Sequence, residues 1–176
     1  MQSDEALYEK LIGGDLRAFD QLYQRYERPL FGFIRRHLAD AQEAEDVLHE
    51  TFLALLRQSE ARRTAYSFRA WVFQIARNGC LNRLRSRQRT ARALAAVSRA
   101  PSEPGLEPER ALEEREVCEA LRRAVARLPS GLGELYQLRA GGMSYEELAD
   151  VLAVPLGTIK SRIHEMVTRL RQEMQR

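Results

Sequence analysis

The side chains best suited to contact another molecule lie near the end of the chain, where hydroxyl, imidazole, carboxylate and cationic groups alternate. At about 100° per residue, one side of a predicted helix after Pro155 carries Ser161, His164, Glu165 and Thr168. Four cations lie on the flanks of that side: Lys160, Arg162, Arg169 and Arg171. Short polar groups can reach base edges in the major groove of DNA, a carboxylate can accept from the cytosine amino group, and long cations reach phosphates. The pattern predicts a DNA-reading helix.

This helix needs an apolar face and a partner helix to position it. The opposite side carries an apolar stripe made of Ile159, Ile163, Met166, Val167 and Leu170. Upstream, Ser144 and Glu147 have the spacing of a capping box, and Ala153-Val-Pro155 suits the tight turn of a helix-turn-helix. An ordinary helical hairpin is the alternative. The motif is also common in repressors, so it does not select one function.

A second basic segment lies in the first half of the chain. Residues 57–92 carry 10 arginines and one acid, Glu60, whereas residues 1–56 carry 6 Lys/Arg and 11 Asp/Glu. Such asymmetry favours contact with a polyanion at two places in the chain, although solvated arginines on an ordinary helix are the alternative.

Most of this segment is predicted to be one long helix, capped by Ser67 and ending near Arg92. Two apolar sides are expected, one with Phe68, Trp71, Val72 and Ile75 and one with Phe73, Cys80 and Leu84. A polar stripe remains between them, made of Gln74, Arg77, Asn78 and Arg85. Trp71 could stack on a base, but its place beside Phe68 and Ile75 favours the core.

The other elements are also predicted to be helices, so the expected class is all-α. Asp15, Asp40 and Ser130 are predicted helix caps, and residues 110–128 are predicted to form a helix that Pro129 ends. Residues 100–108 contain three prolines and a glycine, which interrupt any helix. We therefore expect two small helical domains, residues 1–92 and 112–176, joined by a flexible linker at 93–111.

Catalysis and membrane insertion are not expected. His37, His49 and His164 fall on three separate predicted helices, and the two cysteines, Cys80 and Cys118, fit no metal spacing. No cofactor, metal site or catalytic residue is predicted. There is no apolar run of about 18 residues, and the acidic N-terminus argues against a secretory signal, so we expect a cytoplasmic protein with reduced thiols. A single disulfide between the two cysteines is the alternative.

Taken in order, four motifs resemble the extracytoplasmic-function (ECF) family of RNA polymerase sigma factors. They are EDVLHETF at 45–52, FRAWVFQIARN at 68–78, LP at 128–129, and SYEELA at 144–149 with GTIKSRIH at 157–164. The resemblance implies that the N-terminal domain binds core RNA polymerase and the melted minus-ten element. It implies that the C-terminal domain reads the minus-thirty-five element as duplex, and that the linker threads through the polymerase. An anti-sigma factor is an expected further partner.

The resemblance also assigns residues to each surface. Core polymerase would contact Asp46, His49 and Glu50, and His49 stands where the family usually has glutamine. The minus-ten DNA would contact Arg62, Arg63, Arg77, Asn78, Asn82 and Arg85, with a flipped base held by the loop at 59–66. The minus-thirty-five DNA would contact Thr158, Lys160, Ser161, Arg162, His164 and Glu165. Glu165 replaces a residue that is commonly arginine in the family.

Two other classes of protein are compatible with parts of the sequence. A transcriptional regulator with a helical sensor domain would share the helix-turn-helix but leaves the basic segment at 57–92 unexplained. A helical adaptor or anti-sigma partner would use the acidic face for protein contact and leaves both basic segments without a role.

Overall fold

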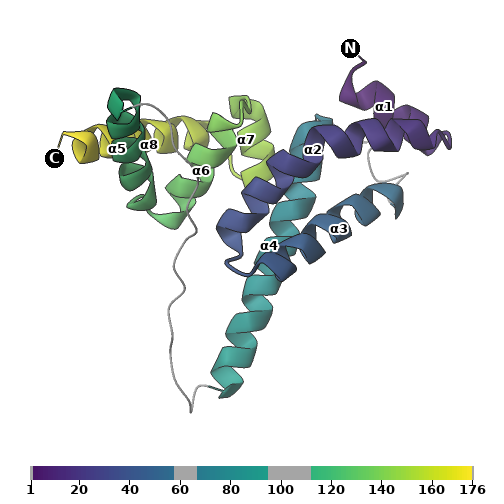
Figure 1. Cartoon of the computed structure of the whole chain (residues 1–176), viewed down its shortest axis with the longest axis horizontal. Helices are drawn as coiled ribbons and strands as arrows, with labels where there is room; N and C mark the ends of the chain where they lie inside the picture. Colours follow the sequence, from purple (N-terminus) through teal and green to yellow (C-terminus); the bar gives the residue numbers. More distant parts are fainter. Residues whose placement is uncertain (1, 58–66, 95–111, 176) are drawn as a thin grey trace. The chain divides into compact units, whose positions relative to one another are not determined.

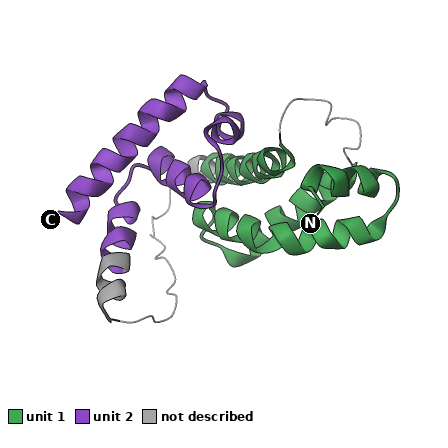
Figure 2. Ribbon diagram, turned by 90° about the horizontal axis from the view of Figure 1, so that it is seen from above, with its two compact units in different colours: residues 1–104 green, residues 105–176 purple. Residues whose placement is uncertain are grey.

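The computed structural model describes residues 2–57, 67–94 and 112–175, with the backbone alone at 91–94 and 112–118. Every regular element in these ranges is a helix, and the chain divides into two compact units, residues 1–104 and 105–176 (Figures 1 and 2). The all-α prediction is confirmed. The helices are α1 (Asp4–Ile12), α2 (Leu16–His37), α3 (Ala41–Arg57), α4 (Phe68–Leu94), α5 (Leu112–Ala126), α6 (Ser130–Ala140), α7 (Tyr145–Leu152) and α8 (Leu156–Met174).

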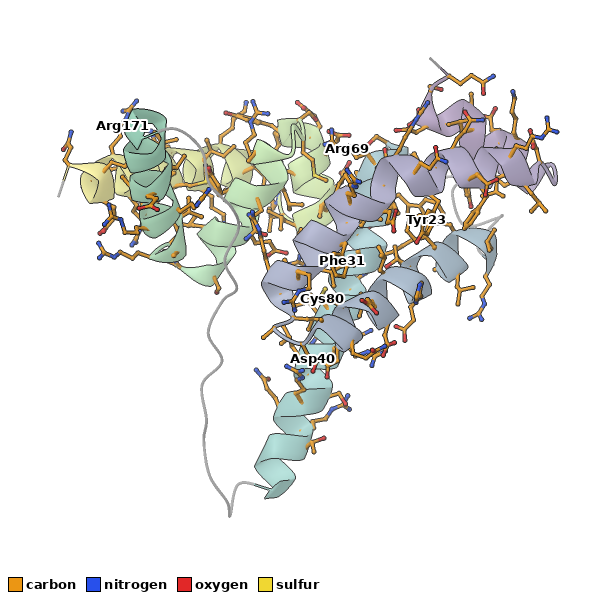
Figure 3. All side chains as sticks on the ribbon, in the orientation of Figure 1. Tyr23, Phe31, Asp40, Arg69, Cys80 and Arg171 are labelled. Atoms are coloured by element: carbon orange, nitrogen blue, oxygen red, sulfur yellow. The ribbon has the colours of Figure 1, made fainter. Side chains whose placement is uncertain are left out.

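Three helix starts in the first unit follow from local side-chain caps. Asp15 accepts from the Arg17 amide at the start of α2, and Asp40 accepts from the Glu43 amide at the start of α3. Ser67 accepts from the Ala70 amide at the start of α4. All three predicted caps are confirmed, and each satisfies an amide that has no partner within its own helix. Figure 3 shows Asp40 at the turn between α2 and α3.

Helix α4 passes against α2 and α3 and then extends beyond them (Figure 1). Phe68, Val72 and Cys80 are buried, and so is Phe73 on the side that meets Phe33 of α2. The two apolar sides predicted for this helix are therefore confirmed. Residues 85–90, in the projecting part, are exposed.

Helix α1 contacts both α2 and the start of α4. The Phe68 amide donates to Glu5 Oε1 at 3.0 Å, and Asp4 accepts from Arg25 and from the Tyr26 hydroxyl. The ring of Phe68 lies 5.4 Å from that of Tyr8 and 5.3 Å from that of Tyr26. The half-buried Trp71 packs on the same rings, 5.1 Å from Tyr8, which agrees with its predicted place in the core.

The second unit contains the predicted helix-turn-helix. Ser144 accepts from the Glu147 amide while the Glu147 carboxylate accepts from the Ser144 amide, so the capping box is confirmed. The turn at 153–155 separates α7 from α8. Its first residue, Ala153, has φ 53°, in the left-handed region that a side chain disfavours.

One predicted cap is wrong. Ser130 is the first residue of α6, not its cap; Pro129 occupies the capping position, and no side chain caps this end. Proline fixes φ at −50° and leaves ψ extended at 144°, so the chain turns into the helix one residue earlier than a serine cap would require. Pro155 has the same role before α8, with φ −58° and ψ 147°.

The predicted helix ends shift by a few residues at both sides of the linker. Helix α4 continues to Leu94, beyond the predicted end at Arg92, and α5 spans Leu112–Ala126 within the predicted 110–128. Residues 95–111 of the predicted linker and the predicted base-binding loop at 59–66 lie outside the described residues, with Arg62 and Arg63.

Candidate nucleic-acid interface

Helix α4 carries its polar groups on two different sides. Gly79 faces α3 so closely that an added Cβ would lie 2.9 Å from Val47 Cγ1. At 100° per residue, Arg83 and Arg87 follow Gly79 along the side that faces α3. Asn78, Asn82 and Arg85 lie roughly 100° to 180° around the helix from these two arginines, and all three are exposed. We call Asn78, Asn82 and Arg85 the exposed α4 stripe.

One predicted DNA contact lies beside this stripe. Arg77 is rotated by roughly 100° from its neighbour Asn78, and it is half-buried. It therefore lies at the edge of the exposed α4 stripe, not in its middle.

The three residues predicted to contact polymerase share the outer side of α3. His49 is exposed, and the side chains of Asp46 and Glu50 are 44% and 59% exposed. We call Asp46, His49 and Glu50 the acidic α3 face. Arg83 reaches it from α4, with Nη2 2.6 Å from Glu50 Oε1 and Nη1 3.8 Å from Asp46 Oδ2.

Sequence reasoning missed the part that Arg83 and Arg87 take in the first unit. Arg87 Nε donates to Glu43 Oε1 at 3.0 Å, so a second arginine of the basic helix is also committed to α3. These acids lie 33 and 44 residues from their arginines along the chain, and no local spacing could have disclosed the pairs.

In the second unit, α8 buries one stripe and exposes the other. Ile159, Met166 and Leu170 are buried, whereas Lys160, Ser161, His164 and Glu165 are exposed. The latter four are called the α8 polar face. Thr158 and Arg162 are half-buried beside it. The Ser161 hydroxyl donates to the Thr158 carbonyl at 3.0 Å, so its lone pairs remain as acceptors toward a base or a donor group.

Glu165 makes an ion pair within its own helix. Its Oε1 accepts from Arg169 Nε at 3.0 Å and lies 2.8 Å from Arg169 Nη2. The spacing of four residues is the usual one for a helical ion pair, so the sequence contained this signal. The negative charge at position 165 is thus balanced by a cation one turn later.

The described residues give no sign of a metal site or a membrane span. No group of three or more His, Cys, Asp or Glu among them is placed to hold a metal ion. None of the helices in the described ranges is long and apolar enough to cross a membrane.

Comparison with known families agrees with the division into two units. Residues 22–90 match the model of sigma-70 region 2, and residues 118–170 match that of sigma-70 region 4. The chain is 34% identical over 171 residues to the RNA polymerase sigma-H factor of Pseudomonas aeruginosa, covering 92% of this chain and 89% of the relative. The chain belongs to the ECF family of sigma-70-like factors. As a sigma factor, it acts in promoter-directed transcription initiation.

Other relatives of this sigma factor carry the same family name. The ECF RNA polymerase sigma-E factor of Escherichia coli K12 is 29% identical over 170 residues, which cover 92% of this chain and 88% of the relative. Two solved structures share the fold. RpoE of Bartonella quintana, in complex with the anti-sigma factor NepR, matches with TM-score 0.70 and 23% identity over 89% of this chain and 96% of that one. CnrH, in complex with the cytosolic domain of CnrY, matches with TM-score 0.66 and 24% identity over 97% and 96%.

Proposed function

We propose that this sigma factor divides its contacts among three surfaces. The acidic α3 face binds core RNA polymerase. The exposed α4 stripe, together with Arg62, Arg63 and Arg77, contacts the melted minus-ten strand. The α8 polar face, with Thr158 and Arg162, reads the minus-thirty-five duplex. The domains would be residues 1–92 and 112–176, with the linker at 93–111 passing through the polymerase.

The arrangement of α3 and α4 is the observation that carries this proposal. The outer side of α3 presents exposed carboxylates, which suit a basic protein surface. The exposed α4 stripe presents amides and a cation, which suit bases and phosphates. Because Arg83 and Arg87 face α3 and the stripe lies on another side of α4, the two kinds of contact do not compete for the same groups of this helix.

The decisive experiment is transcription with purified components. The protein is mixed with core polymerase and a library of promoters, and transcripts are counted. Promoter-specific initiation supports the proposal, whereas failure to bind core or to initiate contradicts it. A regulator of the same fold would instead bind specific duplex DNA alone and would not replace a sigma factor.

The α8 polar face can be divided by two kinds of substitution. Replacing Lys160 or Arg162 by glutamate should weaken binding to every duplex and reduce its salt dependence, because long cations contact phosphates. Glu165→Arg should change the preferred minus-thirty-five sequence more than the overall affinity. An unchanged preference would remove Glu165 from the base-reading set.

The ion pair between Glu165 and Arg169 makes a further control necessary. Glu165→Arg also releases Arg169, which could then reach a phosphate. Arg169→Gln removes that cation and leaves Glu165 in place. A changed preference in Glu165→Arg but not in Arg169→Gln would assign the reading to position 165, and the same change in both would assign it to the pair.

We also infer that this sigma factor acts in the cytoplasm and is controlled by an anti-sigma factor. Both structurally similar proteins were solved in complexes, and the partner of the sigma factor RpoE is the anti-sigma factor NepR. An anti-sigma factor would prevent core binding by covering the same surfaces. Co-purification of a partner whose removal restores core binding tests this inference; co-purification with core alone contradicts it.

A further inference from the structure

One arginine of α4, Arg83, forms ion pairs with both carboxylates of the acidic α3 face. Arg83 Nη2 donates to Glu50 Oε1 at 2.6 Å, and Arg83 Nη1 lies 3.8 Å from Asp46 Oδ2. We propose that Arg83 is an internal counter-ion that competes with core RNA polymerase for Glu50 and Asp46, and so limits the affinity of this sigma factor for the polymerase. The inference rests on the proposed polymerase contact of α3.

The contact lies where a partner protein can reach it. The side chains of Glu50 and Asp46 are 59% and 44% exposed, and that of Arg83 is 34% exposed. Ion pairs at such exposure are weak, because water screens them and two long side chains must be ordered. A cation of the partner can therefore displace Arg83 without a large cost in the stability of the fold.

The geometry indicates that Arg83 competes with the polymerase for the carboxylates and does not merely position them. An arginine binds a carboxylate most strongly through both oxygens, and Oε1 of Glu50 already accepts from Arg83. A cation of the polymerase must share Glu50 with Arg83 or displace it. In either case Arg83 stays close to the polymerase cation, and the repulsion between these two positive charges opposes binding.

Arg87 provides a matched control on the same helix. It lies one turn after Arg83 and pairs with Glu43, with Nη2 2.7 Å from Oε2. Glu43 is outside the acidic α3 face. Arg87→Gln therefore removes the same charge from the same side of α4 without uncovering Asp46 or Glu50, and it controls for the change in long-range attraction.

The test measures the affinity of full-length variants for core polymerase without DNA, at two salt concentrations. We expect Arg83→Gln to bind about two- to fivefold more tightly than Arg87→Gln, the range that exposed ion pairs support. The gain should shrink at high salt. It should vanish when Glu50→Gln and Asp46→Asn are also present. Equal or weaker binding by Arg83→Gln overturns the proposal, and weaker binding would make Arg83 a residue that positions the carboxylates.

Two further measurements keep the test decisive. Thermal unfolding followed by the fluorescence of Trp71 shows whether the first unit stays folded, because Trp71 is the only tryptophan of the chain. If Arg83→Gln does not fold, Arg83→Lys keeps the charge but loses the planar fork, and its affinity should lie above that of the wild type. Failure of the wild type to bind core would contradict the proposed function itself. If the wild type binds core polymerase and Arg83→Gln and Arg87→Gln bind it with equal affinity, only the role of Arg83 is contradicted.

Discussion

Helices α4 and α8 are both basic, and both are proposed to contact DNA, but their surroundings differ. Helix α4 is buried against α1, α2 and α3, and two of its arginines are held by acids that lie far away in the sequence. Helix α8 buries one stripe against α5, α6 and α7, and its Glu173 pairs with the distant Arg127. The ion pair next to its polar face, between Glu165 and Arg169, lies within the helix. Distant acids therefore take two arginines of α4 away from its proposed DNA surface, whereas the ion pair beside the proposed DNA surface of α8 is local.

The largest expected effect breaks the packing of α4. Phe68 is fully buried and touches the rings of Tyr8, Tyr26 and Trp71. Phe68→Ala should lower the free energy of unfolding of the first unit by about 3–5 kcal/mol, because it leaves a cavity and removes the ring contacts. Urea unfolding followed by Trp71 fluorescence measures this unit.

Truncating a half-buried apolar side chain of α8 should lower the free energy of unfolding much less. Ile163 is half-buried, and Ile163→Ala should cost about 1–2 kcal/mol in the second unit, measured by hydrogen exchange of its amides. Similar losses for Phe68→Ala and Ile163→Ala would contradict the greater contribution expected of the fully buried Phe68.

The second-largest effect is expected when one glycine of each helix is replaced by alanine. In Gly79→Ala, the new Cβ would lie 2.9 Å from Cγ1 of the buried Val47, a stiff β-branched side chain. Overpacking should outweigh the helix propensity of alanine and cost about 1 kcal/mol. In Gly157→Ala nothing lies within 4 Å of the new Cβ, so this variant should gain about 0.5 kcal/mol.

Two further variants test the cause. Gly32 is inside α2 with open space around it, so Gly32→Ala should stabilise the same unit that Gly79→Ala destabilises. Adding Val47→Ala to Gly79→Ala should remove the overlap, so that the double variant is no less stable than Val47→Ala alone. If the two Gly→Ala changes in the first unit have equal effects, close packing of α3 on α4 is not the reason for Gly79.

How far the sequence could predict the molecule depends on the range of each interaction. The caps Asp15, Asp40, Ser67 and Ser144 act within a few residues, and all four were predicted. Ser130 was misplaced because the fixed φ of Pro129 starts α6 one residue earlier. The ion pair at Glu165 was within reach of the sequence, since four-residue spacing is local.

The contacts of Arg83 and Arg87 were beyond the sequence for a physical reason. Ten arginines at 57–92 indicate a polyanion surface, but composition cannot tell which of them the fold turns toward α3. The packing of α4 on its neighbours, with Gly79 against Val47 and Phe73 against Phe33, sets the rotation of α4 that brings Arg83 to Glu50. The basic segment thus contains both a candidate DNA surface and the counter-ions of the acidic α3 face.

A smaller effect tests the local character of the helix-turn-helix. Ala153 ends α7 with φ 53°, which glycine adopts without the steric cost of a Cβ. Ala153→Gly should stabilise the second unit by about 0.5–1 kcal/mol, whereas Ala153→Val should destabilise it. Hydrogen exchange of the α7 and α8 amides measures both. A loss of stability in Ala153→Gly would show that this turn is not strained.

The smallest effect concerns a carboxylate of α7. Burial, and then the nearby charges of Glu147 and Glu146, raise the pKa of Asp150. The folded state therefore holds this proton more tightly than the unfolded state, and the ionised side chain costs stability at neutral pH. Asp150→Asn should raise the stability of the second unit at pH 7.

The pH dependence separates this cause from a change in packing. As the pH falls through the raised pKa of Asp150, the wild type gains its proton and the cost declines. Below the ordinary pKa of an aspartate, about 3.9, both states are protonated and the advantage of asparagine should be gone. Hydrogen exchange of α7 amides between pH 7 and pH 4 measures this trend. If the gain in stability is constant over this range, the charge of Asp150 is not its source.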